Sequence, residues 1–298
     1  MFKAGFVAIV GRPNAGKSTL INALLGARLS VVSAKPQTTR HRILGIMEDE
    51  RFQACLLDTP GLIDNPEDPL QKSLRVETTR ALREDADAVL FVVDAAAADP
   101  ASASWDAPPV TPGVPVILVL NKCDLAVGEE KLVELERAYA GALKATRTIR
   151  ASALKGQGVD EIRSAVVSTL PVGEPFYEKG QLSDRWERFF ASEIIRGEVF
   201  HHYSDEIPHA TAVLVEVFRE KKGKPDEIFA TLFVERDGQK GIILGKGGKD
   251  IQKVRERAVK ELESFLGRRV ELELWVKVRK NWRKDPRSLM EFGYLEKK

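Results

Sequence analysis

The segment that most constrains this chain is residues 11–18, which reads Gly-Arg-Pro-Asn-Ala-Gly-Lys-Ser and fits the pattern G-x-x-x-x-G-K-[ST]. It follows the apolar run 6–10 and opens residues 18–25, which have helical length and spacing. Glycines at both ends let the backbone curl so that successive N–H groups point inward, and the helix N-terminus adds the positive end of its dipole. This order predicts a strand, a loop that cradles phosphate groups, and a helix.

Two side chains of this loop have their own predicted roles. The Lys17 ammonium would bridge the outer phosphates, and the Ser18 hydroxyl would bind Mg²⁺. The predicted nucleotide-binding residues of this segment are Gly11, Arg12, Pro13, Asn14, Ala15, Gly16, Lys17, Ser18 and Thr19.

The residues up to about 170 alternate short apolar runs with helical patterns. Residues 54–57, 88–93 and 116–120 are continuous apolar runs rich in Val, Ile and Leu, as expected of strands buried on both faces. Residues 69–83, 129–143 and 160–170 have helical length, and 146–150 is a further strand. This alternation predicts an α/β domain with a doubly wound, mostly parallel sheet. Residues 95–115 are rich in Ala, Ser and Pro and predict an exposed loop.

A second phosphate-facing segment, Asp58-Thr59-Pro60-Gly61, follows the strand 54–57. An Asp at this strand end can hold Mg²⁺ through water, and the Gly61 N–H can reach the terminal phosphate. We therefore add all four residues to the nucleotide site, and Asp58 to the metal site.

A third segment, Asn121-Lys122-Cys123-Asp124, follows the strand 116–120 and indicates which base is bound. An ionised Asp124 only accepts hydrogen bonds, so it matches the ring N–H and the amine that guanine presents side by side. Adenine offers an acceptor there and would leave a buried carboxylate unpaired, at a cost of roughly 1–3 kcal/mol. Lys122 can lie across the base, and Asn121 can tie this loop to residues 11–18.

A fourth segment, Ser152-Ala153-Leu154, follows the strand 146–150 and can offer the Ala153 N–H to the keto oxygen of guanine. Each of these short strings is weak alone. All of them in this order, each at the carboxyl end of a predicted strand, point to one guanine-nucleotide site.

The second half changes character after the linker-like residues 171–175. Residues 183–203 and 249–266 predict helices, and 211–219, 227–235 and 269–280 alternate like strands, so we expect an α+β domain. Between 240 and 287 there are 15 Lys or Arg and 7 Asp or Glu, a net charge of +8, whereas the whole chain carries +2. Such a basic block is either a binding surface for a polyanion or an ordinary well-solvated surface.

The apolar-flanked G-x-x-G at residues 245–248 lies inside this basic block. Glycines permit close approach of a sugar–phosphate backbone, and flanking lysines can neutralise it. It resembles the clamp loop of a KH module, which grips about four nucleotides of single-stranded RNA. The predicted RNA-binding residues are Ile243, Leu244, Gly245, Lys246, Gly247, Gly248, Lys249 and Ile251. We expect three of these residues to belong partly to the hydrophobic core and partly to the wall of the groove that holds the bases, namely Ile243, Leu244 and Ile251.

Other side chains give weaker signals. Trp275 and Trp282 could stack on bases or belong to the core. His201, His202 and His209 lack a supporting Cys or carboxylate constellation, so we expect solvated histidines at a helix end.

These motifs together resemble the Era-type branch of the translation-factor-class, Ras-like P-loop GTPases. Besides the segments quoted above, the resemblance rests on Gln37-Thr38-Thr39-Arg40. It implies a GTPase domain over 1–172, a linker over 173–181 and a type-II KH domain over 182–298. It also implies GTP and GDP as substrate and product, Mg²⁺, and the 3′ region of small-subunit ribosomal RNA as partner in ribosome assembly, with no DNA partner.

The resemblance also assigns the switches. Residues 30–41 would be the first switch, with Thr39, or Thr38 as second choice, completing the Mg²⁺ shell when the terminal phosphate is present. Residues 58–74 would be the second. Lys17, Thr39 and Gly61 are the contacts expected to the transition state.

One residue departs from the common GTPase pattern. Many such enzymes place a Gln after the Asp-x-x-Gly glycine to orient the attacking water, but here this position is Leu62. We therefore expect slow intrinsic turnover. In the resembled branch an Asn in the loop helps hold K⁺, so Asn14 either does this or only braces the loop.

Composition sets the remaining bounds. With 43% hydrophobic and 30% charged residues the chain is globular, and no apolar run is long enough to cross a bilayer. Two cysteines without framework spacing favour a reducing cytoplasm. By resemblance we expect a monomer with a weak contact at the inner face of the membrane.

Two rival hypotheses for the function stay open. One is a P-loop kinase or ATPase, and the other is a scaffold whose KH fold binds no RNA.

Overall fold

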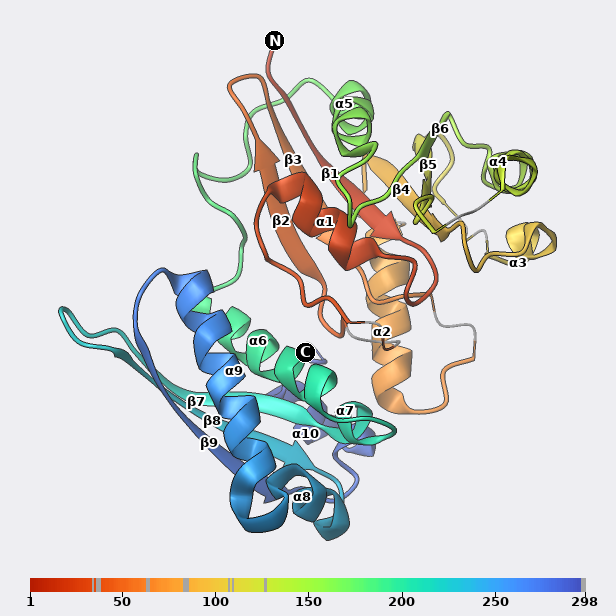
Figure 1. Ribbon diagram of the computed structural model, residues 1–298. Coiled ribbons are helices and arrows are strands. Elements are labelled where there is room, and N and C mark those ends of the chain that lie inside the picture. Colours follow the sequence, from red (N-terminus) through yellow and green to blue (C-terminus); the bar gives the residue numbers. More distant parts are fainter. Residues whose placement is uncertain are drawn as a thin grey trace. The chain divides into compact units, whose positions relative to one another are not determined.

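The computed structural model describes residues 1–33, 35, 39–62, 65–82, 86–106, 108, 110–125 and 128–295 (Figure 1). By their contacts the residues form two compact units. The first comprises Met1–Ser30, Thr39–Asn65 and Leu74–Asp184, and the second comprises Val31–Thr38, Pro66–Ser73 and Arg185–Lys298. Two short segments from the first half of the sequence therefore belong to the second unit.

The first unit is built on a six-stranded sheet of order β2-β3-β1-β4-β5-β6. Its strands are parallel except β2, which pairs with β3 in antiparallel fashion. The strands are β1 (Lys3–Val10), β2 (Ile43–Glu48), β3 (Phe52–Asp58), β4 (Ala88–Asp94), β5 (Val116–Asn121) and β6 (Arg147–Arg150). The predicted doubly wound, mostly parallel sheet is confirmed.

Helices cover both faces of this sheet because its inner strands are apolar on both sides. Along β1, Val7 and Ile9 join the core under α1 and α5, whereas Ala8 and Val10 join the core under α4. The helices are α1 (Lys17–Leu25), α2 (Pro69–Arg80), α3 (Ala103–Asp106), α4 (Glu129–Leu143) and α5 (Val159–Thr169).

The predicted exposed loop at 95–115 is wrong in part. It contains a 3-10 turn at Pro100–Ser102 and the short helix α3. Asp99 caps this turn by accepting from the Ala101 N–H at 3.0 Å, and Ala103 is buried against the sheet. A capping Asp before a Pro is a helix-start signal that the composition of the segment hides.

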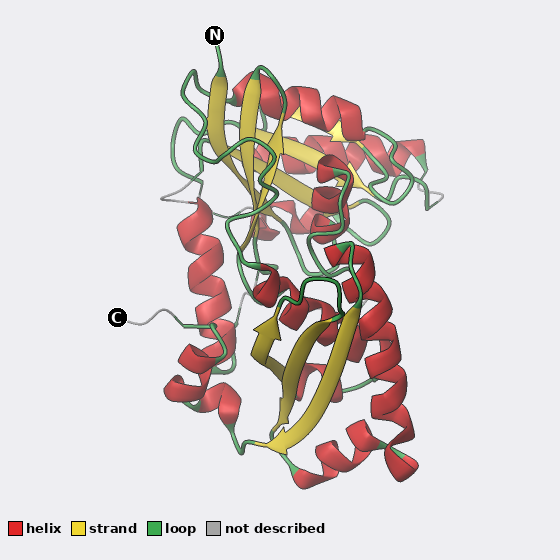
Figure 2. Cartoon of the chain, turned by 90° about the vertical axis from the view of Figure 1, so that its left-hand side faces the viewer, coloured by secondary structure: helices red, strands yellow, loops and turns green. Residues whose placement is uncertain are grey.

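The second unit is an α+β arrangement with a three-stranded sheet of order β7-β8-β9 (Figure 2). β7 and β8 are antiparallel, and β8 and β9 are parallel. The elements are α6 (Glu187–His202), α7 (Ile207–Ala210), β7 (Ala212–Arg219), β8 (Asp226–Val234), α8 (Asp237–Leu244), α9 (Lys249–Leu266), β9 (Val270–Val278) and α10 (Pro286–Glu291).

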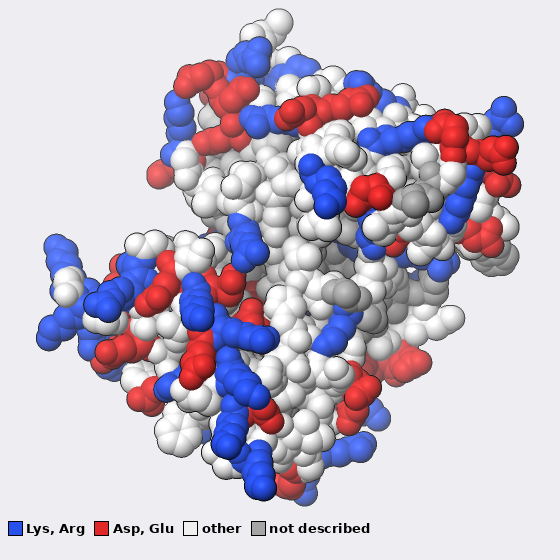
Figure 3. Space-filling model, viewed as in Figure 1, with Lys and Arg blue, Asp and Glu red and all other residues white. Residues whose placement is uncertain are grey.

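One face of the small sheet is covered by α6, α8 and α9. Val254, Ala258 and Leu262 recur every four residues on α9 and are fully buried, which fixes the face that this helix turns to the sheet. Lys and Arg side chains gather along the outer surface of α9 (Figure 3). None of the described helices meets the length and apolarity needed for a membrane span.

Candidate nucleotide and RNA sites

The loop between β1 and α1 takes the curled backbone that its glycines predict. Gly11, Asn14 and Gly16 have φ of 151°, 64° and 94°. A Cβ on Gly11 would lie 2.2 Å from the Val92 carbonyl oxygen, and one on Gly16 would lie 2.2 Å from Asn121 Nδ2. Glycine is therefore required here both by the backbone conformation and by the neighbours.

Lys17 begins α1 and is buried. Its Nζ donates to the carbonyl oxygens of Gly11 at 3.1 Å and Arg12 at 3.0 Å, so the ammonium lies inside the loop. Burial lowers the Lys17 pKa to about 8, and the Asp58 carboxylate opposes this shift. The loop thus holds a cation within reach of any phosphate that it cradles.

Three oxygen-bearing side chains predicted to bind the metal converge beside this lysine. Ser18 Oγ lies 3.0 Å from Thr39 Oγ1 and donates to Asp58 Oδ2 at 3.1 Å. Asp58 is fully buried, and burial raises its pKa, opposed by the Lys17 charge and by hydroxyls including Ser18 and Thr39. Its Oδ1 has no hydrogen-bond partner among the described residues. The alternative Mg²⁺ ligand Thr38 lies outside the described residues.

The segment after Asp58 packs closely on the loop. Thr59 Oγ1 donates to the Ile9 carbonyl at 2.8 Å, and a Cβ on Gly61 would lie 2.9 Å from the Pro13 backbone nitrogen. Thr78 Oγ1 on α2 donates to the Pro60 carbonyl at 2.8 Å, a contact that the sequence does not signal. Leu62 packs against an apolar cluster, so its side chain cannot orient a water molecule.

The loop after β5 is tied to the phosphate loop by Asn121, which is buried. Asn121 Nδ2 donates to the Ala15 carbonyl at 2.9 Å. Lys122 has a φ of 65° and its Nζ lies 2.6 Å from Asp94 Oδ2, while Asp124 is exposed. Asp94 ends β4 and was missed by the sequence reasoning, although an Asp at a strand end could have indicated it.

The segment Ser152-Ala153-Leu154, which is predicted to face the base, makes a hydrogen bond within the protein that the sequence does not signal. The Ala153 N–H donates to Asn121 Oδ1 at 2.9 Å, so a guanine keto oxygen would have to share this hydrogen. Ser152 is buried, and Leu154 is exposed. The structure therefore brings Asn121, Lys122, Asp124 and this segment to one edge of the sheet.

In the second unit, the G-x-x-G loop connects α8 to α9. Gly245, Gly247 and Gly248 all have positive φ, of 67°, 65° and 78°. A Cβ on Gly247 or Gly248 would meet nothing within 4 Å, and Lys246 and Lys249 are exposed. The loop thus presents open backbone flanked by two cations.

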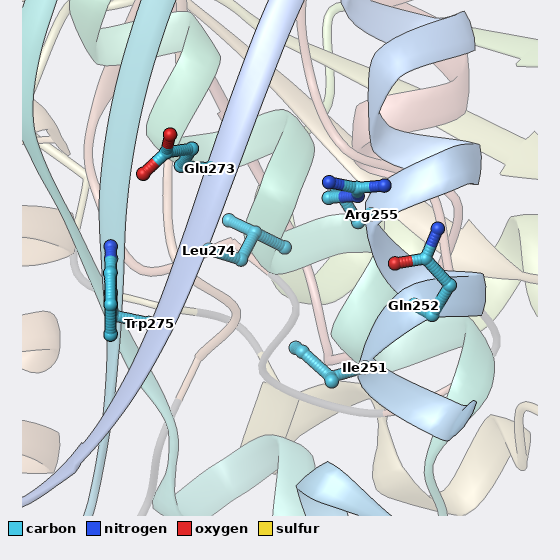
Figure 4. Close-up of a pocket in the computed structure, with 6 residues that line it drawn as sticks. All are labelled: Ile251, Gln252, Arg255, Glu273, Leu274 and Trp275. Atoms are coloured by element: carbon cyan, nitrogen blue, oxygen red, sulfur yellow. The ribbon is translucent and has the colours of Figure 1, made fainter. Parts of the chain in front are cut away.

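A shallow groove of about 190 Å³ runs beside the start of α9 (Figure 4). Ile251, Gln252 and Arg255 of α9 face Leu274 of β9, whereas Glu273 and Trp275 lie on the other side of that strand. Successive residues of a strand alternate between its faces, which explains this division.

Burial bears on two candidates for RNA contact. The Ile243 side chain is fully buried in the core of the second unit, which favours the core role of the two roles predicted for it. Trp282 is fully buried as well and donates from Nε1 to the Ala210 carbonyl at 2.8 Å, which rules out base stacking. Trp275 is 60% exposed and Ile251 lines the groove, so both stay candidates.

Of the two histidines at the end of α6, only His202 is less solvated than expected. The His201 side chain is 44% exposed and contacts Glu198, and the His202 side chain is 16% exposed and lies near Asp250. The described residues include no group of three or more His, Cys, Asp or Glu side chains that could hold a metal ion.

Comparisons with known proteins find matches for both halves of the chain. Residues 6–122 match the family model described as 50S ribosome-binding GTPase, and residues 206–283 match the KH domain model. The chain is 40% identical to GTPase Era of Elusimicrobium minutum over 295 residues, covering 99% of this chain and 98% of that protein. It is 41% identical to GTPase Era of Syntrophus aciditrophicus over 298 residues, covering 99% and 96%.

Two solved structures are similar over almost the full chain. An Aquifex aeolicus Era variant bound to GDP·AlF₄⁻ gives a TM-score of 0.91 at 36% identity, covering 98% of this chain and 99% of that one. Era in complex with MgGDPNP and nucleotides 1506–1542 of 16S ribosomal RNA gives a TM-score of 0.90 at 36% identity, covering 99% of both. Because the two sequence relatives named above are 40% and 41% identical over almost the whole chain, this chain belongs to the Era family of GTPases.

Proposed function

We propose that this chain binds GTP with Mg²⁺ in its first unit and that the nucleotide state controls how the second unit grips single-stranded RNA. The RNA is small-subunit ribosomal RNA near its 3′ end, and the protein assists assembly of the small ribosomal subunit. The observation that carries this proposal is the pairing of a buried phosphate and metal site with an open, cationic G-x-x-G loop on one chain. A family member that binds MgGDPNP together with a 16S ribosomal RNA segment supports it.

The side chains fit Mg²⁺. Ser18, Thr39 and Asp58 supply only oxygen atoms, which this hard cation prefers, and a buried carboxylate oxygen without a hydrogen-bond partner suits a bound cation or its water. Magnesium usually keeps several waters and is held by few protein oxygens plus substrate phosphates. Bound there, it would neutralise charge on the outer phosphates of GTP.

Leu62 cannot orient the attacking water by hydrogen bonding, so hydrolysis would depend more strongly on positive charge beside the phosphates. Asn14, exposed in the loop with a φ of 64°, is the candidate to help hold K⁺ beside the phosphates. We therefore expect slow turnover that K⁺ stimulates. Equal rates of phosphate release in K⁺ and Na⁺ buffers would leave Asn14 with a bracing role only.

The two rival hypotheses are separated by binding measurements. A P-loop kinase or ATPase would let excess ATP displace labelled GTP, whereas Asp124 predicts that ATP fails to compete. A scaffold without RNA binding would show no affinity for single-stranded RNA. We expect measurable affinity that falls steeply as salt rises, because the exposed lysines displace counterions from phosphates.

Changing Lys246 and Lys249 together to Ala tests the clamp. We expect weaker RNA binding, a salt slope smaller by about 1.4 because each phosphate contact on a single strand contributes about 0.7, and unchanged GTP affinity. Lys222 and Lys224, exposed in the turn between β7 and β8, give a matched control with the same charge change. An equal loss in the control pair would overturn the assignment of the clamp. The monomeric state and the peripheral membrane contact stay predictions.

A further inference from the structure

The first predicted switch is divided between the two units. Val31–Thr38 belongs to the second unit by its contacts, and the chain returns to the first unit at Thr39. Thr39 is the residue whose Oγ1 lies 3.0 Å from Ser18 Oγ in the metal site. Thr39 follows Lys35 after only a few residues of chain, so contacts that fix Val31, Val32 and Lys35 limit where Thr39 can lie.

The end of α6 holds this segment through backbone carbonyls. Lys35 Nζ donates to the carbonyl oxygens of Phe200 and Tyr203, in the last turn of α6 and just beyond it. The last carbonyls of a helix have no partner within the helix, and they carry the negative end of its dipole. An ammonium group is a favourable partner for such a helix end.

His201 makes a second contact between α6 and this segment. Its Nε2 lies 2.8 Å from the Val32 carbonyl oxygen, and its Nδ1 lies 3.3 Å from Glu198 Oε1. Because both ring nitrogens face acceptors, only the doubly protonated ring donates to both. The Glu198 carboxylate accordingly raises the His201 pKa, with a smaller contribution from the Val32 carbonyl, while burial and the Lys35 charge oppose the shift.

A third contact depends on a glycine inside α6. A Cβ on Gly197 would lie 2.8 Å from Val31 Cγ1 and 3.3 Å from Val31 Cγ2. A valine side chain is stiff about χ1 and cannot swing away cheaply. The absence of a side chain at Gly197 thus leaves the room in which Val31 packs.

The same end of α6 also holds the RNA loop. Tyr203 Oη donates to the Ile243 carbonyl at 2.6 Å, two residues before Gly245, and His202 Nε2 lies 3.6 Å from Asp250 Oδ1, two residues after Gly248. Consecutive residues of one helix end therefore face the switch segment and both flanks of the G-x-x-G loop.

We propose that the C-terminal turns of α6 form the element that couples the two sites, with Gly197, His201 and the carbonyls of Phe200 and Tyr203 as positioning residues for the switch segment that leads to Thr39. This inference rests on the proposed control of RNA binding by the nucleotide. Docking of Val31, Val32 and Lys35 on α6 accompanies the placement of Thr39 at the metal, and RNA on the G-x-x-G loop acts on the same helix end. Because coupling free energies are reciprocal, RNA must favour the GTP-bound state as much as GTP favours RNA binding.

The first test changes Gly197 to Ala. The measured quantity is the ratio of RNA affinities of the full-length protein loaded with a non-hydrolysable GTP analogue or with GDP. Coupled sites typically give ratios of about 5 to 150. We expect Gly197→Ala to bring the ratio close to 1, because the new methyl displaces Val31, and we expect the double variant Gly197→Ala/Val31→Ala to restore it. Gly141→Ala in α4, where a Cβ meets nothing within 4 Å, is the matched control and keeps the wild-type ratio.

The second test uses the charge of His201. Because only the doubly protonated ring can donate to Val32 and Glu198 together, we expect the wild-type ratio to fall as pH rises through the His201 pKa. His201→Gln should give a ratio that is lower at acidic pH and does not change over this range. This variant keeps the proposal testable if Gly197→Ala fails to fold.

The outcomes separate the two proposals. A wild-type ratio of 1 at every pH overturns the control of RNA binding by the nucleotide itself. A wild-type ratio above 1 that survives Gly197→Ala, or whose pH dependence survives His201→Gln, overturns the role of α6 and leaves the proposed function standing.

Discussion

The two glycine-rich loops of this protein are both predicted to present backbone to phosphates, but they differ in the space around their glycines. In the loop 11–18, a Cβ on Gly11 or Gly16 would lie 2.2 Å from a neighbouring atom. In the loop 245–248, a Cβ on Gly247 or Gly248 would meet nothing within 4 Å. Gly11 and Gly16 are needed because their neighbours leave no room, whereas Gly247 and Gly248 are needed only for the sign of φ. Gly245, at the start of the second loop, is the exception, because a Cβ there would lie 2.2 Å from Asp250 Oδ2.

This difference matches what each loop binds. A nucleoside triphosphate is always the same ligand, so a loop fixed by buried partners such as Lys17 and Asn121 can be formed before binding. A strand of RNA presents a backbone that varies from site to site, and an open loop can follow it. A substitution in the first loop should therefore lower GTP affinity strongly, whereas a substitution in the second should lower RNA affinity only moderately.

The largest effect is expected from Gly16→Ala. A φ of 94° strains any residue with a Cβ, and the new methyl would displace Asn121, which joins the phosphate loop to Ala153. Backbone strain and lost buried hydrogen bonds together cost about 2–5 kcal/mol. Calorimetry should show GTP affinity reduced on the order of 10²- to 10³-fold.

Gly113→Ala provides the control for this prediction. Gly113 has a φ of 90° but a Cβ there meets nothing within 4 Å. If both substitutions lower stability equally and GTP affinity survives in Gly16→Ala, crowding is not what fixes the phosphate loop.

A smaller effect is expected from Gly248→Ala in the RNA loop. Only the positive φ of 78° opposes the substitution, at a cost of about 1–2 kcal/mol. We expect RNA affinity to fall about 5- to 30-fold with unchanged GTP affinity, as measured by fluorescence anisotropy with labelled RNA.

Gly248→Asn sharpens the same point, because Asn adopts positive φ readily and also caps helix N-termini such as that of α9. It should recover most of the lost RNA affinity. Equal losses for Ala and Asn would indicate that the loop is crowded when RNA is bound.

The pH dependence of nucleotide binding gives the smallest effect and tests the buried lysine. Burial lowers the Lys17 pKa to about 8, so the nucleotide-free protein loses this positive charge as pH rises through that value. Since the phosphates bind the charged form, GTP affinity should fall up to about tenfold per pH unit above 8, with uptake of a proton on binding. Titration in buffers of different ionisation enthalpy measures that uptake, and a decline that starts only near pH 10.5 would argue against a buried ammonium.

Most of the nucleotide site could be predicted from the sequence because its chemistry is local. Gly11, Lys17 and Ser18 lie within eight residues, and Asp58 and Asn121 each end a strand whose apolar run is plain. In a parallel sheet these strand ends meet at one edge, so order along the chain gives proximity in space. The family resemblance is carried by the same short segments.

The burial of individual side chains and the contacts between residues distant in the sequence could not be predicted. Ile243 and Trp282 both lie outside the predicted helices and strands, and only the packed structure shows that both are fully buried. The contact between His201 and the Val32 carbonyl could not be predicted because the two residues are 169 positions apart in the sequence. The edge strand β2 lacks a distinct pattern, since Gly45 interrupts its apolar residues.

The most direct test of the account is a calorimetric titration of the full-length protein with single-stranded RNA from the 3′ end of small-subunit ribosomal RNA, once with a GTP analogue and once with GDP. The account predicts affinities that differ by at least about fivefold between the two nucleotides. Identical affinities, or no binding of either nucleotide, would contradict it.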